Sequence, residues 1–503
     1  MMKITYLAHS SFLVECGKTK ILFDPWLNGS AYSDQWFLWP LPPNKSEFLQ
    51  TDAILISHGH EDHMHAPTLK TLDKNTHLFF PFQWKSGARP YLKSLGYRKV
   101  TEAKALKTYT VNDVQITFIG YSLESVIVLE YENEVLVNIN DALNSNHENA
   151  ANFILTEIKQ RWPKIDYLFS GWSGASYFPN QVDFPGKNNV EIGKLREQYF
   201  AHNFFKFTNA LQPTYSACFP PGFVLLKKEN QWINHVKFPR NELEAYYTNH
   251  FDNTDSTSFL TPMPGDVIQK GRMEKVSQLH GLGDEKFYEM AYGYYEKETL
   301  KVNTITWVDE TVILQAIDLL TYWLNYNKQL YNSVILNDAQ FSIRLDDVQV
   351  ATFLNIQFKN GRFTVSCSNS AMPEKRLLIS TTTNKLIQSL ERVWGGDVLT
   401  IGYGFKVEIY DQLTLEKNLD IVCLRLITRY PISRKEMPKE PFRVLNFYGS
   451  NLKITTFWLK QKMLLKPYVN KYPFNERDHW LTYNKCDLCA VCKMPEINLD
   501  AYA

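Results

Sequence analysis

Three histidines and an aspartate fall within six residues directly after an apolar segment. Residues 52–57 have the composition of a buried strand, and His58-Gly59-His60-Glu61-Asp62-His63 follows at once. A strand end holds side chains at fixed separations, and imidazoles and carboxylates are ligands that zinc, iron and manganese accept. The motif therefore predicts a metal centre, with His58 and His60 on one ion and Asp62 and His63 on a second ion beside it.

Length and charge limit the classes of protein to be considered. A chain of 503 residues exceeds what one hydrophobic core usually serves, so two domains are expected. Hydrophobic residues make up 44% and charged residues 21%, as in ordinary globular proteins. Lys plus Arg number 54 against 53 Asp plus Glu, so no global field attracts a nucleic acid, and none is expected as a partner.

The compartment is predicted from the first residues and from the cysteines. Residues 1–7 enter strand-like sequence with no signal-peptide pattern, and no apolar run reaches the roughly 20 residues of a transmembrane helix. Seven cysteines, four of them scattered singly, fit a reducing compartment better than a disulfide framework. We therefore expect a cytoplasmic protein without a transmembrane segment.

The hydrophobic patterns predict two sheets packed face to face with helices outside, followed by a smaller α+β domain. The expected domains are 1–265 for metal binding and catalysis, 266–480 as an accessory domain, and 481–503 as a cysteine-containing tail. In the second domain we predict a helix over 311–326 and a hairpin that turns at Asn360-Gly361. Residues 394–397 are interpreted as a helix end and a turn, and 399–405 as a strand.

Several further segments resemble one branch of the metallo-β-lactamase superfamily. This branch contains ascorbate-6-phosphate lactonase, N-acyl-phosphatidylethanolamine phospholipase D and, with the nearest resemblance, CMP-N-acetylneuraminate hydroxylase. The segments that carry the resemblance are Ala8 to Phe12, Phe23-Asp24-Pro25-Trp26-Leu27, Ile56 to His63, Pro67 to Lys70, Gly174 to Ser176 and Leu211-Gln212-Pro213. The resemblance implies the four-layer αββα sandwich of that superfamily.

The resemblance also implies roles for two aspartates. Asp141 follows the apolar strand 135–139 and matches the family's aspartate that bridges two metal ions. A carboxylate that offers one oxygen to each ion reduces their mutual repulsion. Asp24 is expected behind the ligands, where it would hydrogen-bond an imidazole and fix its tautomer.

Two histidines that the family normally supplies are absent. The first should fall near residues 120–124, where Tyr121 and Glu124 could ligate, and the second near 224–228. Candidate replacements elsewhere in the chain are His9, His65, His147 and His235. The number of bound ions, one or two, therefore stays open, as does the identity of the metal, zinc or iron.

A second cysteine-rich motif lies near the end of the sequence. Cys486, Cys489 and Cys492 are each separated by two residues, and His479 is a candidate fourth ligand. This spacing resembles part of an iron–sulfur or zinc site. We expect no Rieske domain like that of the hydroxylase before residue 1, so an oxygenase would need another source of electrons.

Three functions remain open, the first two of them acting on a small-molecule substrate. The first is hydrolysis by metal-activated water, with Asp62 and His63 as the catalytic residues. The second is iron- and O2-dependent hydroxylation of a nucleotide-sugar-like substrate, with electrons from a separate protein or a cluster at the C-terminal cysteines. The third is a non-catalytic binding protein with a degraded metal site, which the missing histidines favour and the intact motif opposes.

Overall fold

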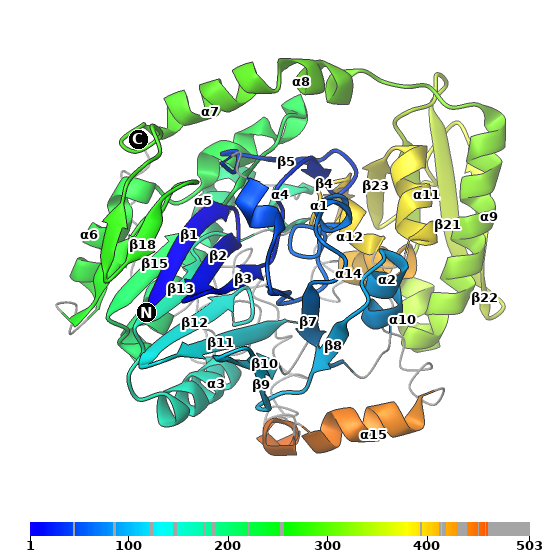
Figure 1. Ribbon diagram of the computed structural model, residues 1–503. Helices are drawn as coiled ribbons and strands as arrows, with labels where there is room; N and C mark the ends of the chain where they lie inside the picture. The colour runs from blue at the N-terminus through cyan, green and yellow to red at the C-terminus, as the bar shows by residue number, and fades with distance from the viewer. Residues whose placement is uncertain are drawn as a thin grey trace.

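Two large sheets occupy the first part of the chain (Figure 1). The computed structural model describes residues 1–460 apart from 44–45, 84–86, 121–123, 144–147, 175–176, 184–187, 220, 252–255, 393–394, 412–413, 415–418, 430–439, 451 and 458. The first sheet has the order β19-β18-β1-β2-β3-β6-β7-β8 and the second the order β17-β15-β13-β12-β11-β10-β9.

The strands of the first sheet are β1 (Met2–Ala8), β2 (Ser11–Cys16), β3 (Thr19–Phe23), β6 (Ala53–Leu55), β7 (His77–Pro81), β8 (Val100–Ala103), β18 (Val267–Gln269) and β19 (Arg272–Glu274). Those of the second are β9 (Thr108–Val111), β10 (Val114–Gly120), β11 (Ser125–Tyr131), β12 (Glu134–Asn140), β13 (Tyr167–Gly171), β15 (Tyr215–Phe219) and β17 (Ser258–Leu260).

Successive side chains of a strand point to opposite faces of its sheet, and in these strands both faces are apolar. One face of each sheet therefore packs on the other sheet, and the opposite face is covered by helices. On β2, Phe12 and Val14 point into the core shared by the two sheets, whereas Leu13 points to the outer face. Helices α1 (Ala66–Thr71) and α2 (Ala88–Ser94) cover the outer face of the first sheet. Helices α3 (Glu148–Arg161) and α5 (Asn189–Leu211) cover that of the second. The predicted four-layer αββα sandwich is confirmed.

The later part of the chain builds a third sheet with its own core. Its order is β14 (Val182–Asp183), β24 (Phe405–Ile409), β23 (Leu377–Thr381), β20 (Phe341–Leu345), β21 (Thr352–Lys359) and β22 (Arg362–Ser368). Helices α9 (Glu310–Asn327), α11 (Thr383–Glu391) and α14 (Leu419–Leu426) pack on it. The predicted hairpin is present, with Lys359 opposite Arg362. Figure 1 shows α7 (Asp284–Tyr294) and α8 (Glu296–Asn303) spanning from the sandwich to this C-terminal unit.

The remaining elements are short. They are β4 (Ser30–Ala31), β5 (Trp36–Leu38), β16 (Phe223–Val224), α4 (Tyr177–Asn180), α6 (Leu243–His250), α10 (Ser333–Asp338), α12 (Gly396–Leu399), α15 (Pro441–Ser450), and the 3-10 helices η1 (Ser46–Leu49), η2 (Lys228–Val236), η3 (Arg240–Glu242) and η5 (Lys328–Leu330). The strand expected over 399–405 is wrong: α12 ends at Leu399, and β24 begins only at Phe405.

Two predictions about organisation can be compared with these elements. The first sheet continues past residue 265 to Glu274, and β14 joins the third sheet although it comes from the first half. The exact division into domains stays a prediction. The described part of the chain contains no helix with both the length and the apolar character needed to cross a membrane.

The packing of Phe12 tests the sandwich core. Its ring stacks on Phe23 at a centroid distance of 4.4 Å and on Phe169 of the opposite sheet at 4.5 Å. Phe12→Ala should lower the free energy of unfolding by about 3–5 kcal/mol, because it leaves a cavity between the sheets. Phe442→Ala is the matched control, since Phe442 is 85% exposed. Equal midpoints of the two variants in chemical denaturation would contradict this packing.

Candidate metal centre

The loop that carries the histidine motif is anchored at both ends. At its start, the Ser57 N–H donates to Oδ1 of the buried Asp24 at 2.7 Å. At its end, His65 caps helix α1, because its Nδ1 accepts from the Thr68 N–H at 3.2 Å. Its Nε2 lies 3.0 Å from the carbonyl oxygen of Ser30. Burial lowers the pKa of His65 to about 4, so this ring is a neutral structural cap, and both of its nitrogens are engaged outside the metal groups.

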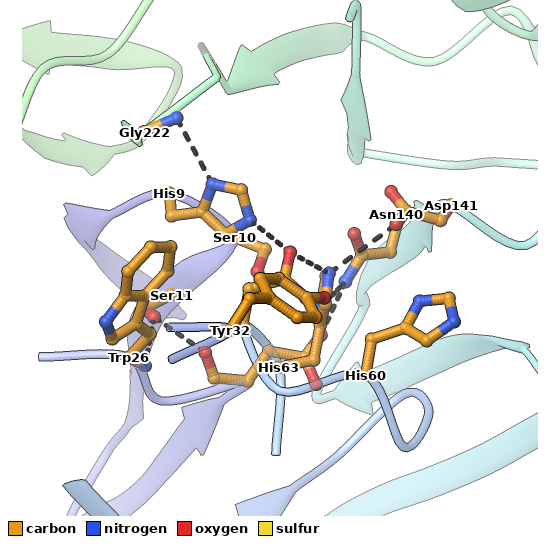
Figure 2. Close-up of polar contacts among 12 residues, drawn as sticks. His9, Ser10, Ser11, Trp26, Tyr32, His60, His63, Asn140, Asp141 and Gly222 are labelled. Atoms are coloured by element: carbon orange, nitrogen blue, oxygen red, sulfur yellow. Dashed lines mark hydrogen bonds and ion pairs between the residues drawn. The ribbon is translucent and has the colours of Figure 1, made fainter. Parts of the chain in front are cut away.

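The other motif side chains converge. Three groups of side chains each bring their ligand atoms within 4.8 Å of one another. These groups are His58, His60 and Glu124; His58, His63 and Asp141; and His9, Asp62 and His63. Because His58 and His63 each belong to two groups, the three form one continuous cluster, and Figure 2 shows several of its members.

Glu124 occupies the neighbourhood in which the first missing histidine was expected. It precedes β11, whose first residue Ser125 pairs with Gly120 at the end of β10. Its half-buried carboxylate faces His58 and His60, whose rings lie 4.5 Å apart. The first group therefore offers two imidazoles and one carboxylate to a cation.

Asp141 belongs to the second group, with His58 and His63. It follows β12 directly, and its Oδ2 is 3.5 Å from Nε2 of His63 and 3.8 Å from Nε2 of His58. Its side chain is 42% exposed, so one side of the cluster is open to solvent. A carboxylate at this place has the position that bridging two ions requires.

Asp62 is held by two side chains from outside the motif. The Tyr32 hydroxyl donates to its Oδ1 at 2.5 Å, and His9 Nε2 lies 2.9 Å from its Oδ2. The Gly222 N–H donates to Nδ1 of His9 at 3.1 Å, as Figure 2 shows. An Nδ1 that accepts a hydrogen bond carries no proton, so the proton of the neutral ring is on Nε2 and is donated to Asp62. In this tautomer His9 orients Asp62 and does not offer a lone pair to a cation.

A second layer of polar side chains supports His63. Asp24 Oδ2 accepts from the Asn140 amide at 2.5 Å and lies 3.4 Å from Nδ1 of His63. Ser10 Oγ lies 3.2 Å from the same nitrogen. His9, Asp24, Tyr32 and Asn140 all have positive φ, between 37° and 54°. Such backbone strain in non-glycine residues gathers at functional sites, where the surrounding structure enforces it.

The electrostatics of the cluster suit a bound cation. Burial, reinforced by His63 and His60, lowers the pKa of His58 well below its usual value, so this imidazole is neutral as a metal ligand must be. Burial opposes charge on both His63 and Asp62, but their mutual attraction and their hydrogen bonds outweigh it. The pKa of His63 is therefore raised and that of Asp62 lowered, so a proton on His63 balances the carboxylates. A metal ion would replace that proton, because histidine and carboxylate ligands lose their protons when they bind a metal ion. These side chains therefore fit a bound metal ion.

The other candidate ligands lie elsewhere. His235 is exposed, and its ring packs against Tyr288 at 5.1 Å, outside the three groups. Residues 224–226, where the second missing histidine was expected, are buried apolar side chains. His147, Tyr121, His479, Cys486, Cys489 and Cys492 lie outside the described residues. The cysteine motif therefore stays a prediction.

Sequence reasoning missed three residues near the site. Tyr32 and Asn140 contact cluster members, and the buried Asp397 of the C-terminal unit acts electrostatically on Tyr32. Asn140 directly precedes the predicted ligand Asp141 in the sequence, and this position is a signal by which it could have been found. Tyr32 stands in no motif, and Asp397 was expected only in a helix end and turn of the second domain, so the fold is what brings both residues to the site.

Comparison with known proteins finds relatives for about half of this chain. Residues 3–144 match the family model of the beta-lactamase superfamily domain. The chain is 26% identical over 307 residues to the inactive cytidine monophosphate-N-acetylneuraminic acid hydroxylase of Homo sapiens, covering 54% of this chain and 55% of that protein. For the hydroxylase of Mus musculus the identity is 26% over 293 residues, covering 54% and 48%. The chain thus spans about half the length of these relatives.

Among solved structures, the diiron β-hydroxylase CmlA of Streptomyces venezuelae aligns with a TM-score of 0.36 at 13% identity, covering 55% of this chain and 54% of that one. The metallo hydrolase Igni18 of Ignicoccus hospitalis aligns with a TM-score of 0.32 at 13% identity, covering 55% and 99%. The predicted resemblance to the hydroxylases is confirmed by the curated relatives, and residues 3–144 of this chain match the beta-lactamase superfamily domain.

Proposed function

We propose that this protein is a metal-dependent hydroxylase that binds iron through His58, His60 and Glu124 and acts on a small polar substrate. The observation that carries the proposal is the position of Glu124 beside the two histidines. Two histidines and one carboxylate around open coordination positions are typical of non-haem iron sites that use O2. Catalytic zinc uses the same ligand set, so the choice of iron rests on the curated relatives named as hydroxylases. Hydrolysis, the first of the alternatives drawn from the sequence, becomes the second candidate.

Bound iron would supply the activation of O2. The overall reaction would insert one oxygen atom into a C–H bond of the substrate, consume two electrons and two protons, and release the other oxygen atom as water. The residues of this chain would hold the ion and keep the imidazoles neutral. The curated relatives named as hydroxylases support this reaction class. The electrons would come from a separate protein or from a cluster at the predicted cysteine motif.

Hydrolysis is supported by a different observation, the place of Asp141 beside both His58 and His63. A second ion held by Asp62, His63 and Asp141 would make the centre dinuclear. Such a centre can supply hydroxide, because a metal ion lowers the pKa of bound water from about 15.7 toward 7. The role of the protein would then be to hold Asp62 through His9 and Tyr32, which keeps the carboxylate directed at that ion.

A non-catalytic binding protein with a degraded metal site is the weakest of the alternatives. The convergence of ligand atoms, the strained residues around them and the open side at Asp141 are features of working sites. Burying Asp62 and His63 costs stability even though the two side chains pair with each other, and a bound cation would offset that cost.

His60 provides a test of metal binding. His60→Ala should lower the metal content by about one ion per chain, because one imidazole of a three-ligand group is lost. The fold should persist, since His60 lies in a loop and is not fully buried. His235→Ala is the matched control and should keep the wild-type metal content. Elemental analysis of both variants checks this, and an unchanged metal content in His60→Ala would refute the assignment.

Glu124 provides a test of metal choice. Glu124→His restores the imidazole usual in the family, so the zinc-to-iron ratio of purified protein should rise several-fold over wild type. Glu124→Gln keeps the size of the side chain but removes its charge, so metal at this group should be lost. The two variants are compared by elemental analysis after growth in the same medium. A ratio that stays the same in Glu124→His would show that this side chain does not select the metal.

A further inference from the structure

The C-terminal unit docks directly against the loop that holds Tyr32. The Gln35 amide donates to the carbonyl oxygens of Tyr32 at 2.6 Å and Val398 at 2.7 Å, so it ties the two segments together. Arg392 donates to the Ser33 hydroxyl at 3.1 Å. At Gly402 a Cβ would lie 2.6 Å from the Cβ of Tyr32, so only glycine allows this approach. The segment around α12 is therefore fixed at the wall of the metal site.

This docking places Asp397 of α12 close to the metal cluster. Asp397 is only 5% exposed, and it acts electrostatically on Tyr32 and Glu61, while His60 and Asp62 act on it. Burial raises the pKa of its carboxyl to about 6. Asp397 belongs to none of the three groups of candidate metal ligands. Its carboxylate therefore lies beside the metal cluster without being one of its ligands.

No described side chain or backbone N–H donates a hydrogen bond to the Asp397 carboxylate. Asp347 in the same unit shows the contrast, because it is buried to a similar degree but accepts from the Thr383 N–H at 2.7 Å and the Thr383 hydroxyl at 2.6 Å. Buried carboxylates are normally satisfied in this way, since leaving one without donors costs stability. Neither carboxylate oxygen of Asp397 is a fully buried atom without a partner, so solvent reaches this group. A carboxylate that is held rigidly beside the metal cluster, reached by solvent and free of protein donors can accept hydrogen bonds from a ligand.

We infer that Asp397 is a substrate-binding residue, and that it accepts hydrogen bonds from hydroxyl or amino groups of the substrate. The inference deepens the proposed function and rests on it, since it assigns the recognition of the substrate at the same metal site to a residue of the C-terminal unit. A carboxylate acceptor beside a cation selects substrates that carry donors near the reacting atom, as polyhydroxylated or aminated compounds do.

The first test compares stability, which does not depend on the substrate. In metal-free protein at pH 7.5, Asp397→Asn should raise Tm by about 2 °C or more, because it removes a buried charge that lacks donors and lies near Asp62. Asp347→Asn should lower Tm, because it weakens a satisfied set of hydrogen bonds. A fall in Tm for Asp397→Asn like that of Asp347→Asn would assign Asp397 a structural role and overturn the inference.

The second test measures recognition in metal-loaded, full-length protein, with CMP-N-acetylneuraminic acid as a probe rich in hydroxyl groups. Asp397→Asn should raise Kd about 10-fold or more at unchanged metal content, since a hydrogen bond to a charged group is lost. Folded Asp347→Asn should keep the wild-type Kd. An equal Kd for wild type and Asp397→Asn, or no binding by metal-loaded wild type, would overturn the inference. A wild-type protein that binds no metal would instead count against the proposed function.

Discussion

Four imidazoles and three carboxylates meet in a partly buried space, and such a cluster is stable only when positive charge is shared among them. In the metal-free protein a proton on His63 supplies that charge, and Asp62 is held ionised beside it. A divalent ion would supply it more completely, since it can contact several ligands at once. This electrostatic requirement explains why so many polar groups are buried behind the ligands.

The two-sheet core makes the arrangement possible. The histidine loop leaves the end of β6, Asp141 leaves the end of β12, and Glu124 precedes β11 beside it. These ends are fixed by strands whose apolar side chains interlock between the sheets. Asp24 and Asn140 then join the two sheets through the hydrogen bond between their side chains. The ligands thus stand on rigid elements, and the strain at His9, Asp24 and Asn140 is sustained by the surrounding packing.

Much of this could be predicted from the sequence because the signals are local. Residues 52–63 show a buried strand followed by ligands, 311–326 show a helix by periodicity, and 348–367 show a hairpin by their strand-like composition and the turn at Asn360-Gly361. His9, Asp24 and Glu124 were candidates, but their roles depend on partners far away in the chain. The tautomer of His9 is set by Gly222, and Glu124 becomes a candidate ligand only where β11 lies beside β12. Tyr32 and Asp397 carry no local signal, since their place follows from the docking of the C-terminal unit.

The central claim is that His58, His60 and Glu124 together bind one iron ion. The most direct measurement is X-ray diffraction from crystals of the protein as purified, with anomalous data collected on both sides of the iron and zinc absorption edges. The account predicts an iron signal within coordination distance of both imidazoles and the Glu124 carboxylate. A zinc signal at that place, or an ion that Glu124 does not contact, would contradict it.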